Sequence, residues 1–176
     1  MPTPRDETAQ KAKTAKQAGK PEDAIQLLMT DHREVEALFK KFEKAKDGHD
    51  AGKADIVAQI CDALSVHAEI EEEIFYPAAR DALSEKDGED LVDEAEVEHE
   101  SIKSLVEWLE EAEPADEHYD AKVKVLMEYV KHHVKEEEGE MFPKVKKTDL
   151  DLDQLGAEMF ERKTELTEDD EKDDSN

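Results

Sequence analysis

The chain has 176 residues, of which 42% are charged and 37% hydrophobic, and its formal net charge is −26. This length suffices for one domain with a core and tails, whereas two domains would be cramped. The negative charge argues against nucleic acid and anionic membrane surfaces as partners, because both would repel the protein. No stretch approaches the ~18 apolar residues of a membrane span and the N-terminus has no signal-peptide core, so we expect a cytoplasmic location.

A single cysteine, Cys61, limits the metal and redox chemistry of the chain. The chain can form no internal disulfide and offers no thiolate cluster to a metal. Any bound metal must therefore take nitrogen and oxygen ligands. We interpret Cys61 itself as a small core residue.

The first part of the chain divides into an arm and a helix. Residues 1–20 have no large apolar side chain after Met1, which predicts a disordered basic arm. A helix is predicted to begin at residues 21–23, where a proline and two acids suit the positive end of the helix dipole. Its core-facing stripe has one polar member, a histidine, and comprises Ile25, Leu28, His32, Val35, Phe39 and Phe42.

Three more helical stripes follow, each with polar side chains in core positions. After a turn at residues 47–52, the second stripe comprises Ile56, Ile60, Leu64, His67, Glu71, Ile74 and Ala78. Asp87 and Gly88 mark the next break, and the third stripe comprises Leu91, Ala95, His99, Ile102, Leu105 or Val106, and Leu109. Pro114 is predicted to open the fourth helix, whose stripe comprises Tyr119, Val123, Leu126, Val130, His133 and Glu137.

The C-terminal part is predicted to be peripheral. Residues 148–163 contain a short amphipathic pattern that could form a capping helix over one end of the bundle, and residues 164–176 are predicted to be a disordered acidic tail. No segment shows the alternation of a β-strand. The predicted fold class is therefore all-α, with the main helices in residues 21–147.

A repeated motif carries the chemistry. The stretch HAEIEEEIFYP, which ends at Pro77, returns as HHVKEEEGEMFP in the second half of the chain. Aligned on their prolines, the two copies match His67 with His133 and Glu71 with Glu137. On a helix, positions i and i+4 share a face. Each copy can therefore aim one imidazole and one carboxylate at the same point.

The repeat extends beyond this motif. The segment DHREVEAL corresponds to the later segment EHESIKSL, which matches His32 with His99. The chain is therefore predicted to consist of two helical hairpins of one design. Packed about a pseudo-twofold axis, they would form a centre of four imidazoles and two carboxylates, from His32, His67, Glu71, His99, His133 and Glu137.

This ligand set suits a two-metal centre. If Glu71 and Glu137 each bridge two ions, an octahedral ion keeps about two positions for an oxo or hydroxo bridge and an exogenous ligand. Iron, manganese and zinc all suit imidazole and carboxylate, and a redox partner such as dioxygen points to iron. The buried imidazoles must stay neutral, so binding should weaken as the pH falls towards ~6.5. Acids beside the ligands could orient the ring N–H groups, namely Asp31, Glu72, Glu98 and Glu138.

In this order and spacing, the sequence resembles the hemerythrin-like (HHE) cation-binding domain family over about residues 22–145. The resemblance implies an up-down-up-down four-helix bundle around a non-haem di-iron centre that meets dioxygen, hydrogen peroxide or nitric oxide, or that reports on iron. It implies that His32 and His67 serve one iron and that His99 and His133 serve the other. Glu71 and Glu137 would bridge the two.

The pattern differs from that of the oxygen-carrying hemerythrins. These carriers have a further histidine one turn after the third-helix histidine, and that place is Lys103 here. Their last histidine-to-carboxylate interval is five residues, whereas His133 and Glu137 lie four apart. These differences disfavour reversible oxygen carriage and favour sensing, scavenging or iron handling.

Several residues have other interpretations. His132 could replace His133, with Glu136 as its partner, although the helical stripe favours His133. His49 and His118 lie in predicted turns and are interpreted as solvated. We interpret the aromatic residues that precede the two prolines, Tyr76 and Phe142, as packing residues.

Competing functions differ in what they require. A di-iron enzyme would turn over peroxide in a catalase-like cycle or reduce nitric oxide. A ferritin-like oxidase or store would need paired Glu-x-x-His motifs, of which the chain offers only Glu96 to His99. A metal-free interaction bundle would be unaffected by metal removal. No partner protein is indicated by the sequence.

Overall fold

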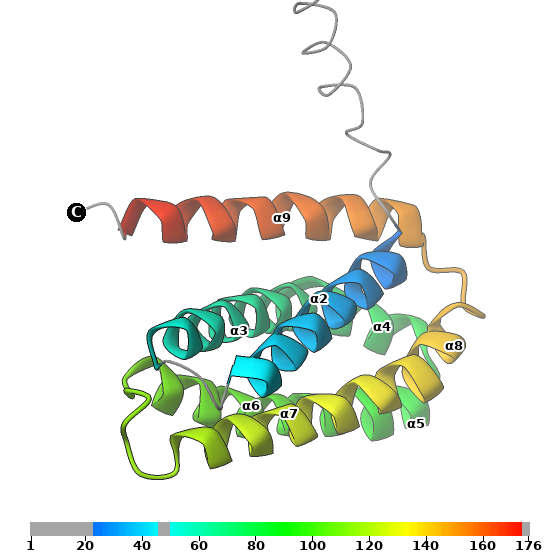
Figure 1. Ribbon diagram of the computed structural model, residues 1–176. Helices are drawn as coiled ribbons and strands as arrows, with labels where there is room; N and C mark the ends of the chain where they lie inside the picture. Colours follow the sequence, from blue (N-terminus) through cyan, green and yellow to red (C-terminus); the bar gives the residue numbers. More distant parts are fainter. Residues whose placement is uncertain (1–22, 46–49, 174–176) are drawn as a thin grey trace, which may run out of the picture.

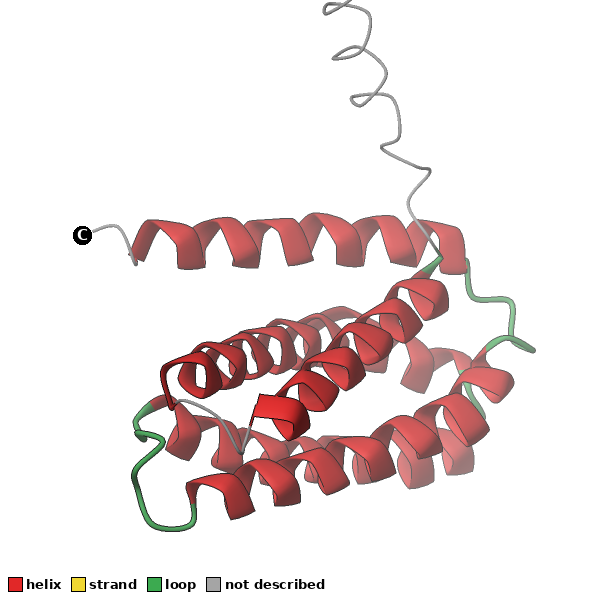
Figure 2. Ribbon diagram, in the orientation of Figure 1, coloured by secondary structure: helices red, strands yellow, loops and turns green. Residues whose placement is uncertain are grey.

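The computed structural model describes residues 23–45 and 50–173, and these are helical except for short connections (Figure 2). Four helical runs pack as an up-down-up-down bundle of two hairpins, and a fifth helix lies across it (Figure 1), which confirms the predicted fold class. The predicted arm, residues 1–20, lies outside the described residues. The elements are α2 Ala24–Ala45, α3 Asp50–Ile70, η1 Glu71–Phe75, α4 Tyr76–Ala82, α5 Glu85–Asp87, η2 Gly88–Val92, α6 Asp93–Glu110, α7 Tyr119–Glu136, η3 Glu137–Met141, α8 Phe142–Val145 and α9 Leu152–Asp173.

The core consists of two apolar clusters with a polar layer between them. Along α2, Leu28 belongs to one cluster and Val35 to the other, and His32 lies between these two residues. The same order recurs in the other three runs of the bundle. The buried polar layer is thus enclosed at both ends by apolar side chains, which restricts the access of water. None of the described helices combines the length and apolar character that a membrane crossing requires.

Helix ends are set by local hydrogen bonds that the sequence pattern indicates only in part. The Asp23 side chain accepts a hydrogen bond from the Gln26 N–H at 3.0 Å, so the predicted start of the first helix is close to the observed one. The predicted break at Asp87 and Gly88 is wrong, because Gly88 is helical. The chain breaks instead before Ser84, whose side chain accepts a hydrogen bond from the Asp87 N–H. The fourth long helix begins at Tyr119, not at Pro114, which lies in a turn.

π-Helical segments shift the register of the buried face. Both η1 and η3 begin at a glutamate that the sequence predicted as a ligand, Glu71 and Glu137 respectively. A π turn contains an extra residue, so the residues that follow rotate about the helix axis relative to an uninterrupted α-helix. The predicted stripe positions Ile74 and Ala78 are only partly buried, and the buried positions are instead Phe75, Tyr76 and Ala79.

The C-terminal helix is longer than predicted. α9 runs to Asp173, so the prediction of a disordered tail from residue 164 is wrong for residues 164–173. α9 lies beside α2, α3 and η1 (Figure 1). Leu155 and Met159 are buried in the core, and Arg162 pairs with Glu69 and Glu73. These contacts anchor the predicted capping helix, and α9 continues from it into the acidic residues that indicated disorder.

Candidate metal centre

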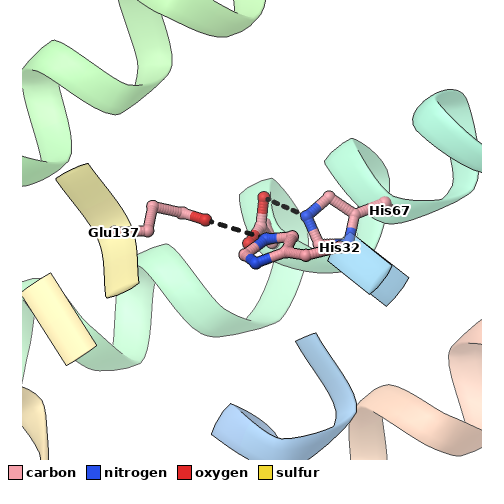
Figure 3. A group of neighbouring side chains, drawn as sticks. His32, His67 and Glu137 are labelled. Carbon is pink, nitrogen blue, oxygen red and sulfur yellow. Dashed lines mark ion pairs between the residues drawn. The ribbon is translucent and has the colours of Figure 1, made fainter. Parts of the chain in front are cut away.

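The six residues predicted as ligands come together in the polar layer of the core. Each bundle helix supplies one histidine, and the two glutamates open η1 and η3. Figure 3 shows His32, His67 and Glu137 pointing towards one another. No member of the set is more than 6% exposed: His32, His67, Glu71, His99, His133 and Glu137.

The ligand atoms form two groups that share a carboxylate. His32, His67, Glu71 and Glu137 make one group, in which the candidate ligand atoms lie within 4.8 Å of one another. Glu71, His99 and His133 make the other on the same criterion. The pairing of histidines thus agrees with the one that the family resemblance implies.

The two carboxylates each lie between histidines from different hairpins. Glu71 Oε2 is 3.3 Å from both His67 Nε2 and His99 Nε2. Glu137 Oε2 is 3.2 Å from His32 Nε2 and 3.6 Å from His133 Nε2. Carboxylates in this position can bridge two cations, one on each side of the layer.

Several buried atoms of this layer are unsatisfied. His32 Nε2, His67 Nε2, Glu71 Oε1 and Glu137 Oε2 have no partner with hydrogen-bond geometry, although two of these atoms are only 3.2 Å apart. Leaving such groups unpaired inside a protein costs a few kcal/mol each. A cation coordinated by nitrogen and oxygen would satisfy all four, so the donor set fits a metal.

The four acids predicted to orient the rings, here called the outer acids, each contact one histidine ring. Every ring uses Nδ1 for this contact, which leaves Nε2 directed at the centre. The distances are 2.9 Å for His32 and Glu138, 3.3 Å for His67 and Asp31, 2.8 Å for His99 and Glu72, and 2.7 Å for His133 and Glu98. Such carboxylate partners fix the tautomer and orientation of a metal-binding histidine.

Basic residues lie behind three of these acids. Arg33 donates to Glu138 at 2.5 Å, Lys103 donates to Glu72 at 2.5 Å, and Lys163 of α9 pairs with Asp31. The lysine that replaces the further histidine of the oxygen carriers therefore has a structural partner. Its ammonium group binds an outer acid and is no ligand.

Tyr76 reaches into the centre, which the sequence pattern does not indicate. Its hydroxyl donates to Glu137 Oε1 at 2.9 Å and lies 3.2 Å from His99 Nε2 and 3.4 Å from His133 Nε2. Tyr76 is thus buried, as expected of a packing residue, but it also makes a hydrogen bond inside the centre. The register shift in η1 rotates it inward, and a π insertion leaves no signal in a periodicity that assumes regular α-helix.

The equivalent residue of the second hairpin does act by packing. The Phe142 ring lies parallel to the His32 ring, with centroids 6.0 Å apart and an interplanar angle of 5°. Because it has no hydroxyl, the side of the centre next to it keeps its unsatisfied nitrogens on His32 and His67. The two halves of the repeat therefore differ chemically.

Comparisons with known proteins identify the family of the chain. The family model described as hemerythrin HHE cation binding domain matches residues 23–145. The chain belongs to this family. The crystal structure of a hemerythrin HHE cation binding domain-containing protein from Mycobacterium kansasii superimposes with a TM-score of 0.67 at 22% identity, covering 82% of this chain and 87% of that one. That likeness concerns the fold.

One curated relative has an unrelated name. A protein of Nostoc sp. called DNA nickase is 30% identical over 120 residues, which cover 68% of this chain. The match covers only 32% of the relative's own length. This HHE domain therefore corresponds to about a third of that protein, and the name describes the whole of it.

Two of the remaining histidines of this HHE domain are exposed. The His132 side chain is 62% exposed, so His133 and not His132 belongs to the buried set. His118 is 70% exposed next to the start of α7. His49 lies outside the described residues.

The carboxylates of the centre favour protonated imidazoles when no metal is bound. Burial opposes a charge on His67, but the charge of Glu71 and the hydrogen bond to Asp31 outweigh it and raise the pKa of His67 to about 10. Burial opposes a charge on His99 too, but hydrogen bonds to Glu71 and Glu72 raise the pKa of His99 to about 9. A metal ion must therefore displace protons from these rings, and competition from protons should begin well above the ~6.5 expected from the sequence.

Two spaces adjoin the HHE centre. A cavity of about 20 Å³ is lined by all four histidines together with apolar residues such as Leu64 and Ile102. It has room for about one water-sized molecule. A groove of about 740 Å³ between α2 and α7 has His32 and Glu138 in its wall. A small molecule could approach the polar layer from this groove.

Proposed function

We propose that this HHE domain holds a non-haem di-iron centre and that it binds or responds to dioxygen, nitric oxide, peroxide or iron. His32 and His67 would hold one ion, His99 and His133 the other, with Glu71 and Glu137 between them. The observation that carries the proposal is the set of buried, unpaired nitrogen and oxygen atoms. Iron is the preferred metal because dioxygen, nitric oxide and peroxide are redox partners. Manganese or zinc would suit the same protein donors.

The surroundings of the proposed site suit a small ligand. A bound di-iron centre would supply open coordination positions and one-electron chemistry. The chain itself supplies orientation, because each ring is fixed through Nδ1 by an acid. It also restricts water, because the cavity beside the histidines has a volume of about 20 Å³ and is otherwise lined mainly by apolar side chains. These features support a ligand of two or three atoms.

Sensing, scavenging or iron handling fits the site better than reversible oxygen carriage. Lys103, which stands where the oxygen carriers have a further histidine, binds Glu72. The second ion would therefore have fewer protein nitrogen ligands than in those carriers. A position left to water or substrate favours turnover or release over stable storage of oxygen. If the oxygenated protein persists for many minutes in air, this preference is wrong.

An anaerobic titration with ferrous iron tests the proposal, followed by admission of air and recording of the visible spectrum. We expect uptake of two irons per chain and new charge-transfer bands after oxygenation. Tyr129→Phe, at an exposed position, serves as a control that should behave as the unmodified protein does. No stoichiometric uptake and a flat spectrum would overturn the di-iron proposal.

A peroxide-decomposing or nitric-oxide-reducing enzyme is the second candidate. The observation that favours it is a hydroxyl inside the centre, that of Tyr76, which lies 3.2 and 3.4 Å from two histidines that line the small cavity. The iron-loaded protein should then evolve oxygen from hydrogen peroxide over many turnovers, and His67→Ala should abolish the activity. A single stoichiometric reaction without turnover would exclude the enzyme and leave the binding function.

A further inference from the structure

One of the four outer acids differs from the others in the residue that it contacts besides its buried histidine. Glu138, Glu72 and Asp31 each pair with a permanently charged arginine or lysine. Glu98 has no such partner among the described residues. It contacts His132, whose Nε2 is 3.2 Å from Glu98 Oε1. At Glu98, a side chain that can bind a metal therefore stands where the other three acids have a fixed cation.

A third residue, Glu136, joins Glu98 and His132 in a group at the surface. Glu136 lies one helical turn after His132 on α7, and its Oε1 is also 3.2 Å from His132 Nε2. The candidate ligand atoms of Glu98, His132 and Glu136 lie within 4.8 Å of one another. One imidazole and two carboxylates are suitable ligands for a divalent transition metal, and the open side leaves positions for water.

The surface group is directly linked to the buried centre. The two oxygens of Glu98 divide between neighbouring histidines, with Oε1 towards His132 and Oε2 2.7 Å from His133 Nδ1. One carboxylate thus contacts both the surface imidazole and a buried one. Glu98 is 19% exposed and His132 is 62% exposed, so the group is accessible to an ion from solvent.

An acidic cavity lies beneath the group. Its volume is about 40 Å³, enough for about one ion or water molecule. It is lined by carboxylate residues and a few apolar side chains, and the carboxylate residues are Glu94, Glu98, Glu136, Glu137 and Glu140. Glu137 belongs to the buried centre, is 1% exposed and has an oxygen without a hydrogen-bond partner. The cavity therefore shares residues with the surface group on one side and with the centre on the other.

We propose that His132, Glu98 and Glu136 form a second, surface site for a divalent transition-metal ion and that this site delivers the ion to the buried centre past Glu137. An ion at this position supplies the positive charge that Arg33, Lys103 and Lys163 supply behind the other three acids. Carboxylates around a narrow path concentrate cations and raise their rate of arrival. The surface site stands on its own geometry, whereas its delivery role rests on the proposed metal centre.

Equilibrium binding tests the surface site. Metal-free protein is titrated with Co²⁺, and bound ions per chain are counted by calorimetry and visible absorption. We expect one ion more in the unmodified protein than in His132→Ala or Glu136→Gln, whatever number the buried centre holds. His118→Ala, at another exposed histidine, should keep the full count. Equal counts in the unmodified protein and in both site variants would overturn the surface site.

Loading kinetics test the delivery role. Anaerobic stopped-flow mixing with limiting Fe²⁺ should show that His132→Ala fills the buried centre about tenfold more slowly than the unmodified protein or His118→Ala. The final amount of buried iron should be the same in all three. An unchanged loading rate would overturn delivery. Failure of every protein to take up buried iron would overturn the proposed function and delivery with it, and the Co²⁺ count would then decide the surface site alone.

Discussion

At the scale of single residues, the hydroxyl of Tyr76 joins the two halves of the polar layer. It contacts one carboxylate from each hairpin, Glu71 at 3.3 Å and Glu137 at 2.9 Å. Tyr76→Phe keeps the buried ring but removes this hydroxyl donor from the two carboxylates. We expect the metal-free protein to lose about 1–3 kcal/mol of unfolding free energy in urea denaturation. Tyr129→Phe, where the side chain is 47% exposed, should change it by less than about 0.5 kcal/mol.

Cys61 gives a prediction that depends on pH. Burial raises the pKa of its thiol to about 12, and the charges of Glu110 and Asp62 add to the effect. The folded chain therefore keeps a proton that the unfolded chain loses above its ordinary pKa of 9.0, so this group lowers stability as the pH rises from 9.0 towards about 12. Iodoacetamide should label Cys61 slowly at a pH of about 9.5 in the folded protein and rapidly in urea. Equal labelling rates would contradict the burial of the thiol.

The six central residues and the four outer acids could be predicted because regular helical spacing determines which side chains share a face. His32, His67, His99 and His133 each stand in the middle of an apolar stripe, and the burial of a polar group there demands a partner. Tyr76 could not be predicted in this way. The inward position of its hydroxyl depends on a π segment, and no residue in η1 indicates one.

At the scale of elements, α9 is attached to the bundle by a narrow apolar contact. Met159 is fully buried, whereas its neighbour Phe160 is 55% exposed. Met159→Ala should reduce the free energy of unfolding by about 2–5 kcal/mol, because it leaves a cavity in the core. Phe160→Ala, which removes a larger side chain, should change it by only about 0.5 kcal/mol. Similar losses in the two variants would mean that α9 does not dock as described.

Two helical glycines should respond differently to substitution by alanine. A Cβ at Gly139, in η3, would meet no atom within 4 Å, so Gly139→Ala should raise stability by about 0.5–1 kcal/mol through the lower entropy of the unfolded chain. A Cβ at Gly88 would lie 3.2 Å from the Arg80 carbonyl oxygen, because η2 approaches α4 closely there. Thermal unfolding should show no gain for Gly88→Ala. A gain of equal size at both positions would contradict this close approach.

The elements that the sequence mispredicted are those fixed by contacts between distant parts of the chain. Gly88 looked like a helix break, but its missing Cβ lets two helices approach. The acidic residues after 164 indicated disorder, yet Arg162 and Lys163 bind acids of α2, α3 and η1 and so hold α9 in place. Local composition contains no information about such partners. Periodicity succeeded for the bundle helices because their apolar faces dominate their packing.

At the scale of the whole molecule, a polar layer separates two apolar clusters in a chain with a net charge of −26. Positive charge in this layer serves two purposes: it satisfies buried carboxylates, and it reduces the repulsion among acids. Protons on His67 and His99 can provide part of that charge. A pair of divalent ions would provide more, and it would also satisfy the nitrogens that have no partner. Metal binding and folding should therefore be coupled.

Removal of metal tests this coupling. A ligand that binds only the folded state stabilises it by about 2.7 kcal/mol at one hundred times its dissociation constant. The iron-loaded protein should therefore melt several degrees above the chelated protein by calorimetry. Glu71→Gln, which removes the charge of a carboxylate common to both groups of ligands, should abolish the difference between the two conditions. A melting temperature that is indifferent to chelation in the unmodified protein would instead support a metal-free interaction bundle, stabilised by protons alone.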